Sequence, residues 1–590
     1  GNVYGMQHDY ENSEKFFNKA LEFLDSTNKV KTAPILGNLG RLHNLQKEYM
    51  KAIEFNEKAL SLYQEVGLEN SRTFIELSTA HWGLGEKRES AKYLDSLIDI
   101  DNKNVLLNFS ILPESAKRLY FATEEGDYWR YNSFVLENRD KFPSMNGRVY
   151  NYTVKNKGLL LKSNTAMRNA IYSSKDSSLI EAYDNWIVLK NQISEKYANG
   201  EDATALNNKA DSLEGNLVKN SNEFSDFKKT QNIDWKQVQN SLKENEVAIE
   251  FTHFPLLNPD SSFVDFTNEI QYVALVINKS SKYPKMIPLF KEKQLEAVIG
   301  KFGGNNYSYI NDIYGTQKKE NKALYNLIWK PIEKQAEGAK KVFLSPSGLL
   351  HKVSFSAIAK SQNVYLCDAY DIEVKSSTGK ITERGNHEPE LNTASLFGGV
   401  DYDTENTDQK IWKYLDGTKA ETEKINKILT KGKLDVNYYS SSEATEEKFK
   451  ETAGNSDVLH IATHGFFYPD PNKVQEQAED NTEYGEITFR GNQGYGVNSF
   501  VESRNPLMRS GLALAGANDV WSQQVKNDSL EDGVLTAEEV SNIDLRKTEL
   551  VVMSACESGL GDIQGSEGVY GLQRSFKMAG VDFIIMSLWQ

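Results

Sequence analysis

The sequence predicts a multidomain protein of the α + α/β class, with helices in its N-terminal part and a mainly parallel sheet in its C-terminal part. Two observations lead to this prediction. A pattern of small residues recurs with a spacing of 39 residues in the first hundred residues. From about residue 236 onward, short apolar segments alternate with helical ones. A chain of 590 residues is also too long for one hydrophobic core, so several domains are expected.

The first region, residues 1–104, contains three segments that align without gaps. The aligned segments are residues 8–21, 47–60 and 86–99. Ser13, Ala52 and Ala91 occupy the same position in them, where a small side chain lets two antiparallel helices approach closely. A fixed period of this length predicts a helical solenoid, and the units resemble tetratricopeptide repeats. An unrelated helical bundle is the alternative. A solenoid would present a concave surface to a protein partner.

Residues 105–235 keep a helical pattern but lose the period. Apolar residues recur at three-to-four spacing on a charged background between residues 177 and 220, which is typical of long amphipathic helices. We interpret this region as a helical spacer.

The α/β region consists of two successive halves, residues 236–393 and 394–590, which suggests a duplicated unit. The expected strands lie within residues 247–251, 271–278, 340–348, 370–377, 394–402, 434–441, 457–465, 549–556 and 581–589. Only the second half has a strand that carries histidine followed by a strand that carries cysteine. The first half is therefore expected to be non-catalytic.

Charge and cysteine content narrow the function classes. The net charge is −15, and direct nucleic-acid binding is disfavoured because it requires clustered Lys and Arg. Two distant cysteines, Cys367 and Cys556, favour a reducing compartment and hence a cytoplasmic protein. Apolar runs such as residues 583–589 are too short to span a bilayer. The chain begins with Gly1 inside an apparent repeat, so we expect further residues upstream.

Two reactive side chains are expected at strand ends, where ligands bind in open α/β sheets. His464 follows the apolar segment 458–462, and Cys556 follows the segment 550–554. A thiol beside an imidazole is the minimum for a cysteine nucleophile with its general base. Gly465 directly after His464 and Gly559 three residues after Cys556 allow backbone N–H groups to face a developing oxyanion. On spacing alone, a buried structural role for Cys556 remains the alternative.

Four segments together resemble the CHAT domain, a caspase- and separase-like cysteine peptidase module that is often fused to tetratricopeptide repeats. The segments are residues 342–358, 458–467, 509–561 and 565–589. The resemblance runs over roughly residues 234–590. It implies that His464 is the catalytic histidine, that Cys556 is the nucleophile, and that the backbone N–H groups of Gly465 and Cys556 bind the oxyanion. Family members usually continue past the strand at which this chain ends, so part of the substrate cleft is expected beyond Gln590.

The resemblance also implies a role. Relatives with this domain combination include bacterial antiviral defence proteases, some held by an RNA-guided CRISPR effector. We therefore expect a cysteine endopeptidase that cleaves a protein substrate without a cofactor and is regulated by a partner on the repeats. The alternative is a non-catalytic scaffold that only binds proteins.

Other candidates have simpler interpretations. His460 and His464 form an H-x-x-x-H pair, but they lie on a strand without an intervening glutamate, so we expect a packed strand residue rather than a metal site. Cys367 lies in an apolar run and is expected to be structural. Glu567 is a candidate substrate contact, with a helix-capping acid as the alternative. The polar segment 470–506 is expected to be either a gating lid or a solvated hairpin.

Overall fold

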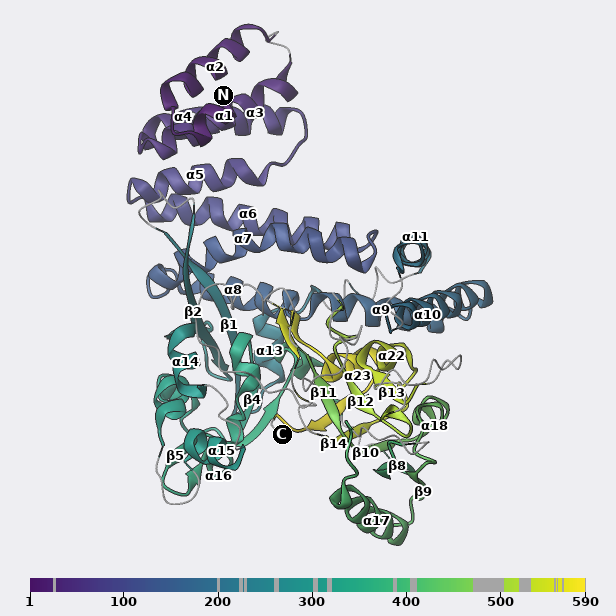
Figure 1. The fold of residues 1–590 in the computed structure, drawn as a ribbon. Coiled ribbons are helices and arrows are strands. Elements are labelled where there is room, and N and C mark those ends of the chain that lie inside the picture. Colours follow the sequence, from purple (N-terminus) through teal and green to yellow (C-terminus); the bar gives the residue numbers. More distant parts are fainter. Residues whose placement is uncertain are drawn as a thin grey trace.

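The computed structural model describes most of the 590 residues (Figure 1). The residues outside the description are 25–27, 199–201, 222–226, 228–230, 259–264, 301–305, 316–320, 386–389, 404–410, 469, 471–502, 504, 519–531, 556–558, 560, 565–566 and 589–590. The N-terminal helices form a stack at one end of the molecule, and the α/β part lies at the other end (Figure 1). In the described residues, no helix is long and apolar enough to cross a membrane.

The repeat region consists of paired helices. Their bounds are α1 (Asn2–Met6), α2 (Tyr10–Glu22), α3 (Lys29–Leu45), α4 (Tyr49–Glu65), α5 (Ser71–Gly83) and α6 (Lys87–Phe109). The repeating small residues Ser13, Ala52 and Ala91 are all buried. At Gly40 of α3, an added Cβ would overlap the side chain of Asn56 on α4. The small residues that predicted the repeat therefore lie inside the helix stack, where the helices approach closely.

The helices that follow join the repeats to the α/β part. They are α7 (Glu114–Asn138), α8 (Pro143–Asn156), α9 (Leu159–Ser174), α10 (Ser177–Ala198), α11 (Thr204–Asn220) and α13 (Trp235–Ser241). Gly158 has a positive φ of 62° and separates α8 from α9. One hydrophobic core includes Leu97 of α6, Phe134 of α7 and Leu275 of the first sheet. The last helices of the stack and the first sheet thus share a continuous core.

The first sheet has the strand order β3-β2-β1-β4-β7 in the described residues. Its strands are β1 (Glu246–Leu257), β2 (Phe266–Asn278), β3 (Lys285–Lys291), β4 (Lys341–Ser345) and β7 (Asp371–Val374). The short helices nearby are α14 (Glu292–Ile299), α15 (Asn306–Tyr314) and α16 (Leu366–Ala369). β2 runs antiparallel to both β1 and β3, while β4 runs parallel to β1 and β7. This sheet is therefore mixed rather than mainly parallel.

The second sheet is parallel throughout its described strands, in the order β17-β14-β10-β8-β9. Its strands are β8 (Thr393–Val400), β9 (Asp435–Ser441), β10 (Val458–Ala462), β14 (Leu550–Ser554) and β17 (Phe583–Met586). The helices of this part are α17 (Asp416–Lys431), α18 (Glu446–Thr452), α22 (Ala537–Asn542) and α23 (Leu572–Ala579). The prediction of an α/β fold with a mainly parallel sheet is confirmed here.

Short antiparallel strands complete the fold. They are β5 (Ala359–Ser361), β6 (Val364–Tyr365), β11 (Gly465–Phe467), β12 (Ser510–Ala513), β13 (Val534–Thr536), β15 (Asp562–Gln564) and β16 (Gly568–Tyr570). β11, β12 and β13 form one small sheet, and β15 pairs with β16. These strands have two to four residues each, too few to show an alternating pattern in the sequence.

The helices α9 and α10 contact the second half of the α/β part directly. The guanidinium of Arg168 on α9 donates a hydrogen bond to the carbonyl of Ala579, where α23 ends. Lys190 on α10 forms an ion pair of 2.7 Å with Glu538 on α22. The helical part is thus attached to α22 and α23 of the second α/β half.

Candidate active site

The two candidate catalytic residues follow neighbouring parallel strands. Ala462 of β10 pairs with Ser554 of β14, and these are the last residues of the two strands. His464 and Cys556 each come two residues after this pair. Cys556 itself lies outside the described residues, so only the histidine side of the site can be built in detail.

His464 has a fixed orientation. Its side chain is buried, and its ring lies between the rings of Tyr402 and Trp412, with centroid distances of 5.1 and 5.3 Å. Its Nε2 atom lies 2.7 Å from the carbonyl oxygen of Lys413. A carbonyl only accepts hydrogen bonds, so Nε2 must carry the proton. The neutral imidazole then has its basic lone pair on Nδ1.

The backbone at His464 is held on both sides. The N–H of Ala513 on β12 donates to the carbonyl of His464 at 2.9 Å. The hydroxyl of Thr463 donates to the carbonyl of Ala513, and it also lies 2.9 Å from the hydroxyl of Tyr402. Gly465 begins β11 and pairs with Leu512. The histidine therefore lies at a junction between the parallel sheet and the small antiparallel sheet.

Comparison with known families finds two domains in the chain. A tetratricopeptide repeat model matches residues 1–65, and a CHAT domain model matches residues 318–590. The chain is a fusion of tetratricopeptide repeats with a CHAT domain. The CHAT domain is related to caspase-like cysteine peptidases, and its match includes both His464 and Cys556. No curated protein matches the chain.

A glutamate bridges the two strands of the CHAT domain that precede the candidate residues. Oε1 of Glu421, on α17, lies 3.0 Å from Nε2 of His460 on β10. Its Oε2 accepts a hydrogen bond of 3.0 Å from the hydroxyl of Ser554 on β14. Burial lowers the pKa of His460, although the charge of Glu421 opposes this shift. His460 is buried on its strand, as expected from the sequence. Nothing in the sequence identified Glu421, which lies in an ordinary amphipathic helix.

Glu567 has its carboxylate engaged within the protein. Oε1 accepts a hydrogen bond of 2.9 Å from the N–H of Leu160, in the first turn of α9, and Oε2 forms an ion pair of 2.9 Å with Arg574 on α23. Arg574 is buried, and the Glu567 side chain is only 9% exposed. These contacts favour the alternative interpretation, in which Glu567 caps a helix. The helix it caps belongs to the N-terminal part of the chain, about 400 residues away in sequence.

Two other sequence predictions have different outcomes. Cys367 is exposed on α16, so the apolar run around it does not bury the thiol and the expected structural role is wrong. The segment 470–506 lies almost entirely outside the described residues, and its proposed gating role stays a prediction.

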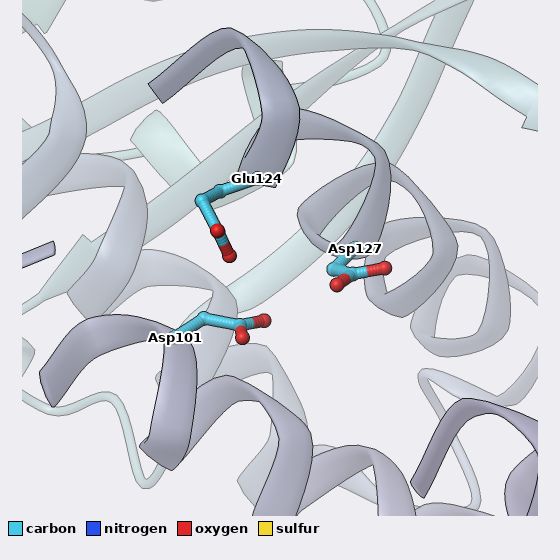
Figure 2. A group of neighbouring side chains, drawn as sticks. All are labelled: Asp101, Glu124 and Asp127. Atoms are coloured by element: carbon cyan, nitrogen blue, oxygen red, sulfur yellow. The ribbon is translucent and has the colours of Figure 1, made fainter. Parts of the chain in front are cut away.

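An acidic cluster lies on two helices of the helical part (Figure 2). Carboxylate oxygens of Asp101 on α6 and of Glu124 and Asp127 on α7 lie within 4.8 Å of one another. Burial and mutual repulsion raise the pKa of Asp101 to about 8, and burial raises the pKa of Asp127 to about 6. Protons therefore neutralise part of this cluster at neutral pH.

Proposed function

We propose that the CHAT domain is a cysteine endopeptidase in which His464 activates Cys556. The observation that carries this proposal is the hydrogen bond from Nε2 of His464 to the carbonyl of Lys413, because it leaves Nδ1 as the base. The strands β10 and β14 also support it, because their last residues pair with each other and each candidate residue follows two positions later. A general base for a thiol must be held in one tautomer and one orientation, and His464 meets both conditions.

The proposed reaction needs only groups of the chain and water. Nδ1 of His464 takes the proton from the thiol of Cys556, and the thiolate attacks the carbonyl carbon of a peptide bond. The N–H groups of Gly465 and Cys556 stabilise the oxyanion. The imidazolium returns its proton to the leaving amine, and a water molecule, deprotonated by the same imidazole, hydrolyses the thioester. The peptide is released as a carboxylate and the thiol is restored.

The repeats suggest how the peptidase is regulated. We propose that residues 1–104 bind a protein partner, that residues 105–235 transmit this binding, and that residues 394–590 are the catalytic half beside a non-catalytic half, 236–393. The contacts of α9 and α10 with α22 and α23 support this division, because they connect the helical part to the candidate site region. The partner is proposed to be a protein of the cytoplasm, such as an RNA-guided CRISPR effector in bacterial antiviral defence.

Cleavage of a denatured protein mixture tests the proposal. The wild-type protein, Cys556→Ala, His464→Ala and Cys367→Ser are incubated with a denatured protein mixture, and new N-termini are identified by mass spectrometry. We expect cleavage by the wild type and by Cys367→Ser, whose thiol lies outside the proposed mechanism, and none by the other two. Equal cleavage by Cys556→Ala would contradict the proposal. Absence of cleavage by every protein, with and without a bound partner, would favour a protein-binding scaffold.

A further inference from the structure

A cavity of about 410 Å³ lies between the helical part and the first sheet. Helices α7 and α8 form one side of it, and strands β1 and β2 form the other. Its volume is in the range of pockets that bind small molecules. Neither His464 nor any other residue of the candidate active site lines it, so the cavity is a separate feature.

The helical side of the cavity carries aromatic rings. The rings are those of Phe121, Tyr128 and Trp129 on α7 and Tyr152 on α8. Tyr128 lies next to Phe121 and Tyr152, with ring centroids 6.2 and 4.9 Å apart. Tyr128 and Tyr152 are buried, so their rings are held in place. Such a wall offers π faces to a ligand at little entropic cost.

Glu125 also lines the cavity, on the same helix as three of these rings. Within the described residues, its carboxylate has no hydrogen bond and no ion pair. Burial raises the pKa of Glu125 to about 7, and the negative charge of Glu567 adds to this shift. The carboxylate is thus a partly buried charge that the described residues leave uncompensated.

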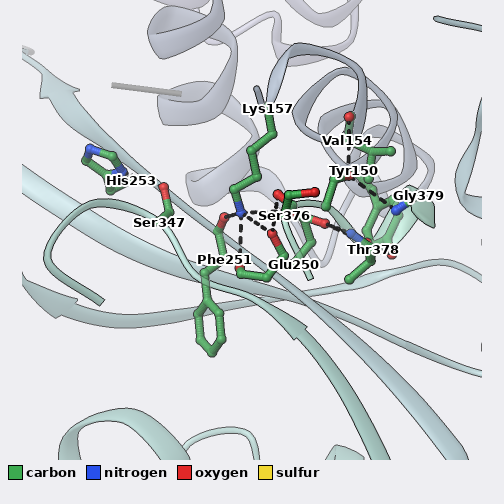
Figure 3. Close-up of polar contacts among 12 residues, drawn as sticks. Tyr150, Val154, Lys157, Glu250, Phe251, His253, Ser347, Ser376, Thr378 and Gly379 are labelled. Carbon is green, nitrogen blue, oxygen red and sulfur yellow. Dashed lines mark hydrogen bonds and ion pairs between the residues drawn. The ribbon is translucent and has the colours of Figure 1, made fainter. Parts of the chain in front are cut away.

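Lys157 lines the cavity, but its ammonium is already bonded to other groups of the protein. The ammonium of Lys157 contacts Oε1 of Glu250 at 2.6 Å, the hydroxyl of Ser345 at 2.7 Å, and the carbonyls of Phe251 and Ser345 at 3.0 Å (Figure 3). An ammonium has three protons, so these contacts saturate it. His253 also lines the cavity but carries no positive charge at neutral pH, because burial and the charge of Lys157 lower its pKa to about 4.

We propose that this cavity binds a compact organic cation, such as an alkylated ammonium, between the aromatic wall and the carboxylate of Glu125. The rings attract the cation through their π faces, and the carboxylate supplies the opposite charge. An anion would find no unused cation in the described lining, and it would be repelled by Glu125. The net charge of −15 also attracts cations to the protein.

Choline and its uncharged analogue 3,3-dimethylbutan-1-ol test the proposal, because the two molecules have nearly the same shape. Binding to the full chain is measured by calorimetry and by the fluorescence change of tryptophan at about pH 8, where Glu125 is mostly ionised. We expect saturable choline binding below about 5 mM and at least about tenfold weaker binding of the neutral analogue. Equal binding of the two molecules, or no choline binding, would overturn the proposal.

Variants locate the site. Glu125→Gln keeps the shape of the side chain and is expected to weaken choline binding about tenfold, and Trp129→Leu about fivefold. Glu124→Gln is the matched control, because Glu124 is adjacent in sequence but does not line the cavity. Circular dichroism checks that each variant folds. Equal loss in Glu125→Gln and Glu124→Gln would contradict the assignment. A trimethyllysine peptide that binds more tightly than choline would support the same chemistry and identify a protein side chain as its source.

Discussion

Replacing Glu567 with glutamine tests whether this residue joins the helical part to the CHAT domain or contacts substrate. Glutamine keeps an oxygen that can accept the hydrogen bond from the N–H of Leu160. It removes the charge that faces Arg574. Burial lowers the pKa of Arg574, but Tyr570, Glu567 and Glu114 together raise it above its ordinary value. The main effect of Glu567→Gln is therefore that the buried guanidinium loses its ion-pair partner.

The size of the effect follows from the contacts of Arg574. Breaking a buried ion pair by removing one partner costs about 3–5 kcal/mol. Glu114 supplies a second negative charge nearby, and the guanidinium carbon lies 4.1 Å from the centroid of the Tyr570 ring. Both remaining interactions offset part of the loss, so we expect about 3 kcal/mol for Glu567→Gln. Glu567→Ala also loses the hydrogen bond to Leu160 and should cost about 1 kcal/mol more.

Hydrogen exchange of the amides in α9 and α23 is the appropriate assay, because local opening of one junction need not unfold the whole chain. Exchange in both helices should accelerate by about two orders of magnitude in Glu567→Gln. The exposed Glu447→Gln is the control and should leave exchange unchanged. If Glu567→Gln leaves exchange unchanged and raises KM for a peptide substrate, the residue contacts substrate and the structural interpretation is refuted.

Three further predictions concern other ionisable side chains. Lys157→Met should lower the free energy of unfolding by about 3 kcal/mol. The double variant with Glu250→Leu should recover part of this loss in urea titrations, but not all, because Glu250 also accepts hydrogen bonds from the N–H and hydroxyl of Thr378; no recovery would contradict the ion-pair assignment. Glu421→Gln should lower the pKa of His460 further, because Glu421 is the group that raises it, and NMR titration of the imidazole checks this; an unchanged pKa would show that the bridge is absent. Asp101 holds its proton up to about pH 8 in the folded state but only to about pH 4 when unfolded, so wild-type stability should fall as pH rises between these values. In Asp101→Asn, the difference in the free energy of unfolding between pH 5 and pH 8, measured by urea titration, should be smaller than in the wild type by more than about 2 kcal/mol. The same difference in both proteins would contradict this prediction.

The sequence predicts the main elements of the fold well and their pairing less well. Each of the nine expected strand segments contains a strand, because apolar β-rich runs report burial directly. Strand direction has no such signal, so the antiparallel placement of β2 could not be predicted. The strand β3 was also missed. Its five apolar residues, 286–290, are consecutive rather than alternating, and they include Pro288, which argues against a strand in the sequence.

The candidate site shows the same division. The positions of His464 and Cys556 at strand ends follow from local patterns. The partner of His464 is the backbone carbonyl of Lys413, which carries no side-chain signal in the sequence. Glu421 and Leu160 reach the site region from distant segments only when the sheets and helices pack. The exposure of Cys367 likewise depends on how its short helix lies on the surface.

The central claim is that His464 activates Cys556, and labelling of the cysteine tests it most directly. Wild type, His464→Ala and Cys556→Ala are treated with peptidyl acyloxymethyl ketones that vary in the residue before the reactive group, and labelled sites are identified by mass spectrometry. We expect that Cys556 is labelled in the wild type, that Cys367 is not, and that labelling of Cys556 is lost in His464→Ala. Equal labelling of Cys556 in the wild type and in His464→Ala would contradict it.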